Sequence, residues 1–184
     1  MTASHLPAPL QLPELPPLSP LSKPQKNSIS LIWAHDLSLV REKMIKENLL
    51  PEHIIDDAIV EYRKFMALLR LGFQRLSMHS REVDQVWHTH IIFTKNYAAF
   101  CDQVFGEFIH HDPITSRTPV EAMKNTNASF FEAYNKVFGK PSSLWPAYNP
   151  NVYELCQPTG KSAELCQPTG KSAELCQPTG KNFA

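Results

Sequence analysis

The chain has 184 residues, a length that suits one domain of ordinary size, either alone or with extensions. Its 18 Lys and Arg residues balance its 18 Asp and Glu residues, so the composition supplies no basic field for nucleic acid or an anionic membrane surface. No apolar run approaches the roughly 18 residues that cross a bilayer, and the N-terminal sequence lacks a signal-peptide pattern, so a cytoplasmic location is the default expectation.

Residues 1–27 form a proline-rich leader. Because proline lacks a backbone N–H and has a fixed φ, we expect this leader to be extended or disordered, with local polyproline II character. Two proline pairs, at positions 13 and 16 and at positions 17 and 20, match the PxxP spacing that SH3-like domains bind, although such matches also arise by chance. The leader is therefore one candidate contact for an unknown protein partner.

Residues 28–146 are expected to form an all-α domain of about four or five packed helices. A first helix is predicted over 35–48, and a long amphipathic helix is predicted over 51–73. The apolar residues of the long helix recur at steps of three and four: Ile55, Ile59, Tyr62, Phe65, Met66, Leu69 and Phe73. No alternating strand pattern is present, although residues 76–78 are compatible with a short extended segment.

Two helices are expected in the centre of the domain. Ser80 is suited to the N-cap of a helix that begins near Arg81, and a second helical stretch runs from Thr94 to a stop at Gly106. The pattern leaves open whether a bend near Phe93 separates the two.

A last helix is predicted after residue 118. Thr118 and Glu121 form a capping box with Pro119 in the first turn, and the apolar pattern then continues to Gly139.

Potential metal ligands concentrate in the central region. Four of the eight histidines lie within residues 88–111, together with carboxylate, phenol and thiol groups. The candidate ligands are Asp84, His88, His90, Cys101, His110 and His111, with Tyr97 and Asp112 as supporting polar residues. Such a mixture of nitrogen, oxygen and sulfur donors suits zinc, iron or copper.

Helical spacing divides this set in two. Asp84 and His88 are four residues apart and share a helix face, whereas His88 and His90 differ by about 200° and point to opposite sides. If the helix continues, His90, Tyr97 and Cys101 line a second face. The turn at 110–112 is compatible with either face, and an aspartate beside a histidine also suits a supporting role that fixes the tautomer of a ligand.

A structural interpretation competes with the metal site. Tyr97 and Cys101 lie on apolar stripes, and a half-buried histidine often only donates a hydrogen bond to a carboxylate or carbonyl. The domain is then a non-catalytic binding or scaffold module. An enzymatic role would make one histidine a general base or metal ligand, whereas Cys101 on its apolar face is better suited to an inert buried thiol than to a nucleophile.

The central segment resembles the glycine-rich domain-containing protein-like family. The likeness rests on VDQVWHTHI at 83–91, on the Tyr97 and Cys101 that follow, and on FGEFIHHDP at 105–113. The resemblance implies a helical domain, extending from the second predicted helix to about Val137, without an assigned reaction. Some plant members carry a glycine-rich region with RNA-binding character, but this chain has only 6 glycines and lacks such a region.

The tail, residues 147–184, contains three copies of ELCQPTGK, each with one cysteine: Cys156, Cys166 and Cys176. The repeats contain too few apolar residues for a core, so a flexible tail is expected. Regular thiols suit capture of a soft metal, intermolecular disulfides or modification by another enzyme, and the tail is a second candidate contact for a protein partner. Expansion of a short DNA repeat explains identical copies without any function.

Overall fold

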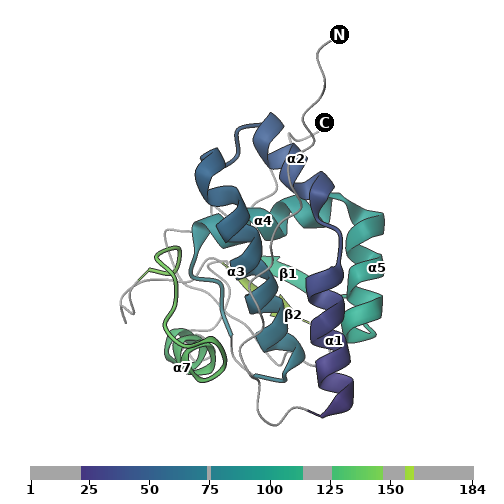
Figure 1. The fold of residues 1–184 in the computed structure, drawn as a ribbon, viewed down its shortest axis with the longest axis vertical. Helices are drawn as coiled ribbons and strands as arrows, with labels where there is room; N and C mark the ends of the chain where they lie inside the picture. The colour runs from purple at the N-terminus through teal and green to yellow at the C-terminus, as the bar shows by residue number, and fades with distance from the viewer. Residues whose placement is uncertain (1–21, 74–75, 114–125, 147–155, 160–184) are drawn as a thin grey trace.

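The computed structural model describes residues 22–73, 76–113, 126–146 and 156–159 (Figure 1). These residues are mostly helical, which confirms the predicted all-α domain. In chain order the elements are α1 (Lys23–Ala34), α2 (Ser38–Lys46), α3 (Glu52–Arg70), α4 (Arg81–Ile92), α5 (Thr94–Phe105), β1 (His110–Pro113), α7 (Thr126–Phe138) and β2 (Cys156–Thr159).

Helix α1 begins inside the segment that composition assigned to the leader. Ser22 is its N-cap and forms a capping box with Gln25: the Gln25 N–H donates to Ser22 Oγ over 3.4 Å, and Gln25 Oε1 accepts from the Ser22 N–H over 3.0 Å. Pro24 lies in the first turn, where its missing N–H costs nothing. The high proline content therefore concealed a regular helix start.

The C-terminal end of α1 is held by Arg63 from α3. The guanidinium donates hydrogen bonds to the carbonyl oxygens of Ile32, of Trp33 at 2.8 Å and of His35 at 2.8 Å. These carbonyls lack partners within the helix, so the buried arginine supplies the donors that a helix end requires. This contact also explains why the helix predicted over 35–48 is shorter than expected: His35 ends α1, and α2 begins at Ser38.

Helix α3 confirms the long amphipathic helix and forms the centre of the core. Its predicted apolar face is buried, with Ile55, Ile59 and Phe65 each 0% exposed. Helix α7 is attached to α3 through the buried carboxylate of Glu61, which accepts hydrogen bonds from Tyr134 Oη at 2.6 Å and Trp145 Nε1 at 2.7 Å.

A break at Phe93 separates α4 from α5, which answers the question that the sequence pattern left open. Phe93 has φ −80° and ψ 63°, outside the helical region, and is both the C-cap of α4 and the N-cap of α5. Gly106 ends α5 with φ 74°, a left-handed conformation that glycine adopts without steric cost. Ser80 is the N-cap of α4, as predicted, and accepts from the Val83 N–H at 3.2 Å.

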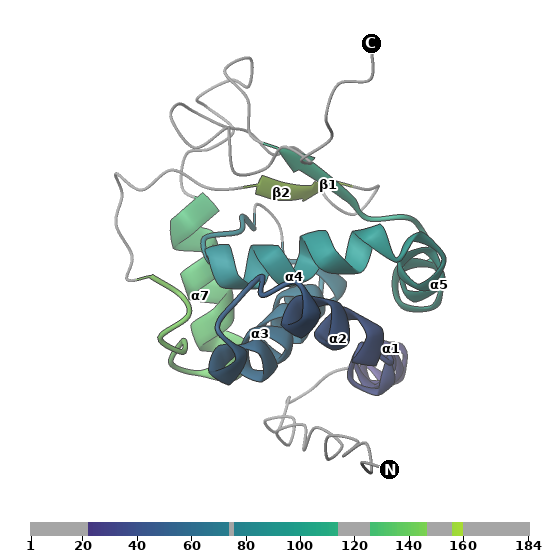
Figure 2. The ribbon, with the colours of Figure 1, turned by 90° about the horizontal axis from the view of Figure 1, so that it is seen from above.

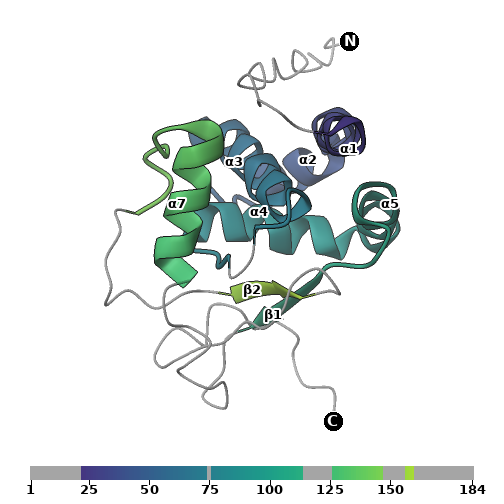
Figure 3. The same ribbon diagram turned by 90° about the horizontal axis from the view of Figure 1, so that it is seen from below.

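Helix α4 lies between α3 and a small β ribbon. Figures 2 and 3 show the two-stranded β1–β2 ribbon on one side of α4 and α3 on the other, with α5 at one end of α4. Side chains of α4 therefore alternate between the helical core and the ribbon. This position determines which histidines of the central segment can meet.

The ribbon was not predicted. Strands β1 and β2 pair antiparallel with His110 opposite Thr159, His111 opposite Pro158 and Pro113 opposite Cys156. Pairs in an antiparallel ladder alternate between hydrogen-bonded and non-hydrogen-bonded types, and both prolines fall in pairs of the same type. That register is compatible with two residues that have no N–H to donate. Each strand has only four residues, too few for an alternating pattern to be recognised in the sequence.

Some predictions lie outside the described residues. These are the capping box at 118–121 and most of the proline-rich leader and tail. Among the described residues, none of the helices combines the length and hydropathy that a membrane span requires.

Candidate metal centre

Asp84 and His88 come from the first two turns of α4. The Ser80 cap fixes where the helix begins, and the four-residue spacing then places both side chains on the same face. Asp84 Oδ2 and His88 Nε2 are 3.7 Å apart. The pair predicted from helical spacing is therefore present.

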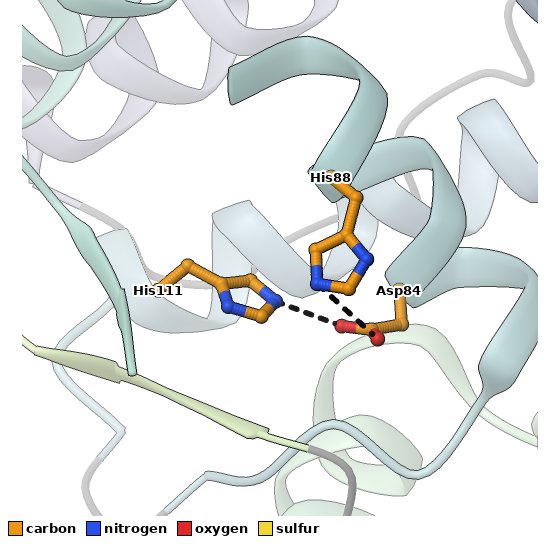
Figure 4. A group of neighbouring side chains, drawn as sticks. All are labelled: Asp84, His88 and His111. Atoms are coloured by element: carbon orange, nitrogen blue, oxygen red, sulfur yellow. Dashed lines mark hydrogen bonds and ion pairs between the residues drawn. The ribbon is translucent and has the colours of Figure 1, made fainter. Parts of the chain in front are cut away.

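His111 joins this pair from strand β1. Its Nε2 lies 3.0 Å from Asp84 Oδ1, and its ring lies edge-on to Trp87 with centroids 4.5 Å apart. Figure 4 shows both histidine rings directed at the Asp84 carboxylate, one from α4 and one from the strand. Two segments separated in the sequence thus converge on one carboxylate.

The position of the strand depends on a buried relay through Tyr97. Trp87 Nε1 donates to Tyr97 Oη at 3.0 Å, and Tyr97 Oη donates to the carbonyl of Ile109 at 2.5 Å. Because Ile109 precedes His111 by two residues, the relay fixes the segment that leads into β1. Tyr97 thus acts as a positioning residue rather than as a ligand.

The three side chains satisfy a geometric condition for sharing an ion. One ligand atom from each of Asp84, His88 and His111 lies within 4.8 Å of the others. Zinc bonds of about 2.0–2.1 Å at tetrahedral angles place ligand atoms roughly 3.3 Å apart, between the 3.0 and 3.7 Å separations from the Asp84 oxygens. The separations of the two histidine nitrogens from the carboxylate are therefore close to those in a zinc site, one to each Asp84 oxygen.

The site is shielded on one side and accessible on the other. The side chains of Asp84 and His111 are 4% and 6% exposed, whereas that of His88 is 25% exposed. Burial lowers the pKa of His88, an effect that the Asp84 carboxylate opposes and His111 reinforces. A lowered pKa keeps the imidazole neutral near pH 7, which is the form that binds a metal ion.

His90 lies in a different cluster on the opposite side of α4. Its Nε2–H donates to Asn96 Oδ1 at 2.8 Å, and its Nδ1 accepts from Tyr62 Oη at 2.9 Å. His35 donates to the same Asn96 oxygen at 2.9 Å. Both ring nitrogens of His90 are therefore occupied by protein partners. Burial lowers its pKa to about 3, so the ring is neutral at physiological pH.

The structure separates the other candidate ligands from the Asp84 group. His110 and Asp112 are exposed and lie on the face of β1 opposite to His111, because successive strand residues alternate. Cys101 is a buried free thiol on α5, and burial raises its pKa. Since the helix is broken at Phe93, His90 and Tyr97 do not lie on one continuous helix, yet their rings meet edge-on with centroids 5.0 Å apart.

Of the tail thiols, only Cys156 falls within the described residues, in strand β2 opposite Pro113. Cys166 and Cys176 lie outside them.

Sequence reasoning missed the partners of His90. Tyr62, Asn96 and His35 come from α3, α5 and the end of α1, and no spacing rule connects them to α4. It also missed His79, a buried residue whose Nε2 lies 2.8 Å from Ser77 Oγ and whose pKa burial lowers to about 3. The LSMHS segment offered one usable signal, since a serine two residues before a histidine, just ahead of an N-cap, can form a local hydrogen bond with it.

Comparison with known proteins places the chain in a family without naming a reaction. No curated protein and no solved structure matches it. The resemblance to glycine-rich domain-containing proteins stays a prediction. A family model described as UCP032817-like matches residues 34–138, which include Asp84, His88 and His111 and exceed half of the 184 residues. The chain therefore belongs to the UCP032817-like family.

Proposed function

We propose that this protein binds a divalent transition-metal ion, with zinc as the first candidate, through Asp84, His88 and His111. The observation that carries the proposal is the convergence of three ligand atoms within 4.8 Å from two separate elements. Two imidazoles and one carboxylate form a donor set that zinc uses in proteins, and iron(II) and copper accept it as well.

The burial of Asp84 and the hydrogen bonds that hold the strand of His111 also favour metal binding. Asp84 is buried at the start of α4, and two histidines, His88 and His111, lie beside its carboxylate. A divalent ion would neutralise that carboxylate and draw both Nε2 atoms to one point. The Trp87–Tyr97–Ile109 relay holds the strand of His111 in place, as supporting residues of metal sites commonly do.

The competing function is a binding or scaffold module in which the cluster is purely structural. The 3.0 Å distance between His111 Nε2 and Asp84 Oδ1 favours it, because this is the length of an ordinary hydrogen bond. The two functions differ in whether a metal ion replaces the proton on His111 Nε2.

Elemental analysis and zinc titration of the metal-free full chain test the proposal. We expect one equivalent of metal per chain in the wild type. Asp84→Asn or His88→Ala should weaken zinc binding by more than about 100-fold, because losing a ligand costs more than losing a supporting partner. His110→Ala is the matched control, since it removes an exposed histidine from the same strand and should leave binding unchanged.

Two results would overturn the proposal: a folded wild type that takes up no zinc, iron or copper, or a His88→Ala variant that binds as tightly as the wild type. Either would leave the structural cluster as the function of these residues.

A further inference from the structure

The Asp84 group, made of Asp84, His88 and His111, is buried on one side and partly exposed on the other. We propose that an ion bound there keeps a coordination position open on the exposed side, where a small monoanion replaces water. This inference rests on the proposed function, because it requires an ion at the three residues, and it deepens that function by naming the class of ligand that the ion takes.

The ligand set leaves room for a further ligand. Within the residues that the structure describes, the group that can share an ion provides three ligand atoms, two imidazole nitrogens and one carboxylate oxygen. Structural zinc sites are closed by four protein ligands, whereas catalytic zinc sites keep three and a position for water. Iron(II) sites with two histidines and one carboxylate likewise keep open positions. The donor set is therefore that of an open site.

The three ligands are grouped on one part of the coordination sphere. The rings of His88 and His111 are adjacent, with centroids 4.3 Å apart, and Figure 4 shows both directed at the same carboxylate. Ligand atoms that approach an ion from neighbouring directions leave its opposite side to other ligands.

Unequal burial indicates the direction from which a further ligand arrives. The side chains of Asp84 and His111 are almost fully buried, whereas that of His88 is a quarter exposed. Trp87 is fully buried and lies edge-on to the His111 ring, so it closes the site toward the core. Water and small solutes therefore reach the ion past His88.

The charge of the occupied site favours an anion. A divalent ion with the Asp84 carboxylate and two neutral imidazoles carries a net charge of about +1, which is costly in a partly buried place. A monoanion brings the charge to zero, whereas a neutral ligand of the same size does not. In the exchange one metal–water bond breaks and one metal–anion bond forms, and no group is oxidised or reduced.

Cobalt(II) is the probe for the test, because its visible absorption changes with the number and kind of its ligands. We expect the metal-free full chain to take up one cobalt ion, and azide then to change the visible spectrum saturably. Azide without cobalt should give no change. Acetate should displace azide at least about 10-fold more strongly than acetamide, which is similar in size but uncharged.

Two control variants separate this response from other sites. His110→Ala removes an exposed histidine from the same strand and should leave the azide affinity unchanged. The second control combines Cys156→Ser, Cys166→Ser and Cys176→Ser, because thiolates also bind cobalt and the tail carries three of them. It should give the same azide response as the wild type.

The outcomes distinguish this inference from the proposed function. A wild type that binds cobalt but does not respond to azide has a closed site, and so does one that responds only after its tail thiols are removed. Either result overturns the open position and leaves metal binding intact. Equal displacement by acetate and acetamide overturns the preference for an anion. No cobalt uptake by the wild type overturns both proposals.

Discussion

Two histidines that are only two residues apart on α4 lie in opposite kinds of environment. His90 is fully buried, and each of its ring nitrogens has a protein partner, Tyr62 on one side and Asn96 on the other. His88 is a quarter exposed, and its Nε2 lies 3.7 Å from a carboxylate, beyond hydrogen-bond distance. We call these the closed cluster (His35, Tyr62, His90, Asn96) and the open cluster (Asp84, His88, His111).

The comparison teaches that the number of satisfied polar atoms, rather than the residue type, separates a structural histidine from a candidate ligand. In the closed cluster both ring nitrogens of His90 have hydrogen-bond partners, Tyr62 and Asn96, so a metal ion would have to displace one of them. In the open cluster the imidazole of His88 has a nitrogen directed at a carboxylate without a hydrogen bond between them. The two clusters should therefore respond to mutation in opposite ways.

The largest expected effect is on stability and comes from the closed cluster. His90→Ala removes a buried ring and leaves the Tyr62 hydroxyl without its acceptor, so the free energy of unfolding should fall by about 3 kcal/mol. Zinc stoichiometry should not change. Urea denaturation of the metal-free protein measures the first quantity, and titration measures the second.

His88→Ala is the reciprocal control, because it should lose zinc binding while changing the metal-free stability by less than about 1 kcal/mol. If His90→Ala abolishes zinc binding in a folded protein, the distinction between the clusters is wrong.

The next effect is stabilisation by the metal. Zinc at about 100 times its dissociation constant should raise the free energy of unfolding by about 2.7 kcal/mol, because the ion binds the folded state alone. Thermal denaturation with and without zinc measures this shift. Asp84→Asn should show no shift at the same zinc concentration; an equal shift in that variant would mean that the ion binds elsewhere.

Tyr97→Phe should produce a smaller effect that links stability to binding. The change leaves the Trp87 N–H and the Ile109 carbonyl without their buried partner, which should cost about 2 kcal/mol of stability. Zinc affinity should also fall by about 10-fold, because the strand of His111 loses its support.

Tyr62→Phe is the matched comparison, since it removes one buried hydroxyl from the closed cluster. It should lower stability without changing zinc affinity. Equal losses of zinc affinity in the two variants would show that Tyr97 has no specific effect on the strand.

The smallest effect, counted per pH unit, is a dependence of stability on pH. Burial lowers the pKa of His90 from 6.5 to about 3, so the unfolded state takes up a proton first as the pH falls. The contribution of His90 is therefore complete above pH 6.5 and is lost as the pH falls toward 3. Between about pH 6 and about pH 4 the loss should approach 1.4 kcal/mol per pH unit.

His90→Gln should reduce that slope by the same amount in denaturation measured at several pH values. An unchanged slope in His90→Gln would contradict a neutral buried His90.

Local patterns predicted the two residues of the open cluster that lie on one helix. The four-residue spacing of Asp84 and His88 and the Ser80 cap were enough to place both on one face of α4. The pattern did not choose between His110 and His111, since that choice depends on a four-residue strand whose partner begins at Cys156. Pairing between distant segments leaves no periodic trace in so short a strand.

The short reach of sequence patterns also explains where the predicted helices differ from the observed ones. The long helix α3 was predictable because its apolar face repeats over many turns, and Gly106 marked the end of α5. Helix α1 was missed because proline content outweighed a capping box at its start. The partners of His90 were missed because three other segments supply them.

Helix α1 shows that the hydrophobic core of the domain extends beyond the region matched by the family model. All of this helix except its last residue, Ala34, precedes the shared family region, yet Ile29 and Ile32 are 0% and 1% exposed and lie in the common core. Figure 1 shows α1 beside α3 and α5. A fragment cut at the family boundary would uncover apolar surface on both helices and leave the buried Arg63 without the Ile32 and Trp33 carbonyls, two of the three that it binds. Such a fragment should aggregate, so we expect cooperative folding to require α1 although most of it lies outside the shared region.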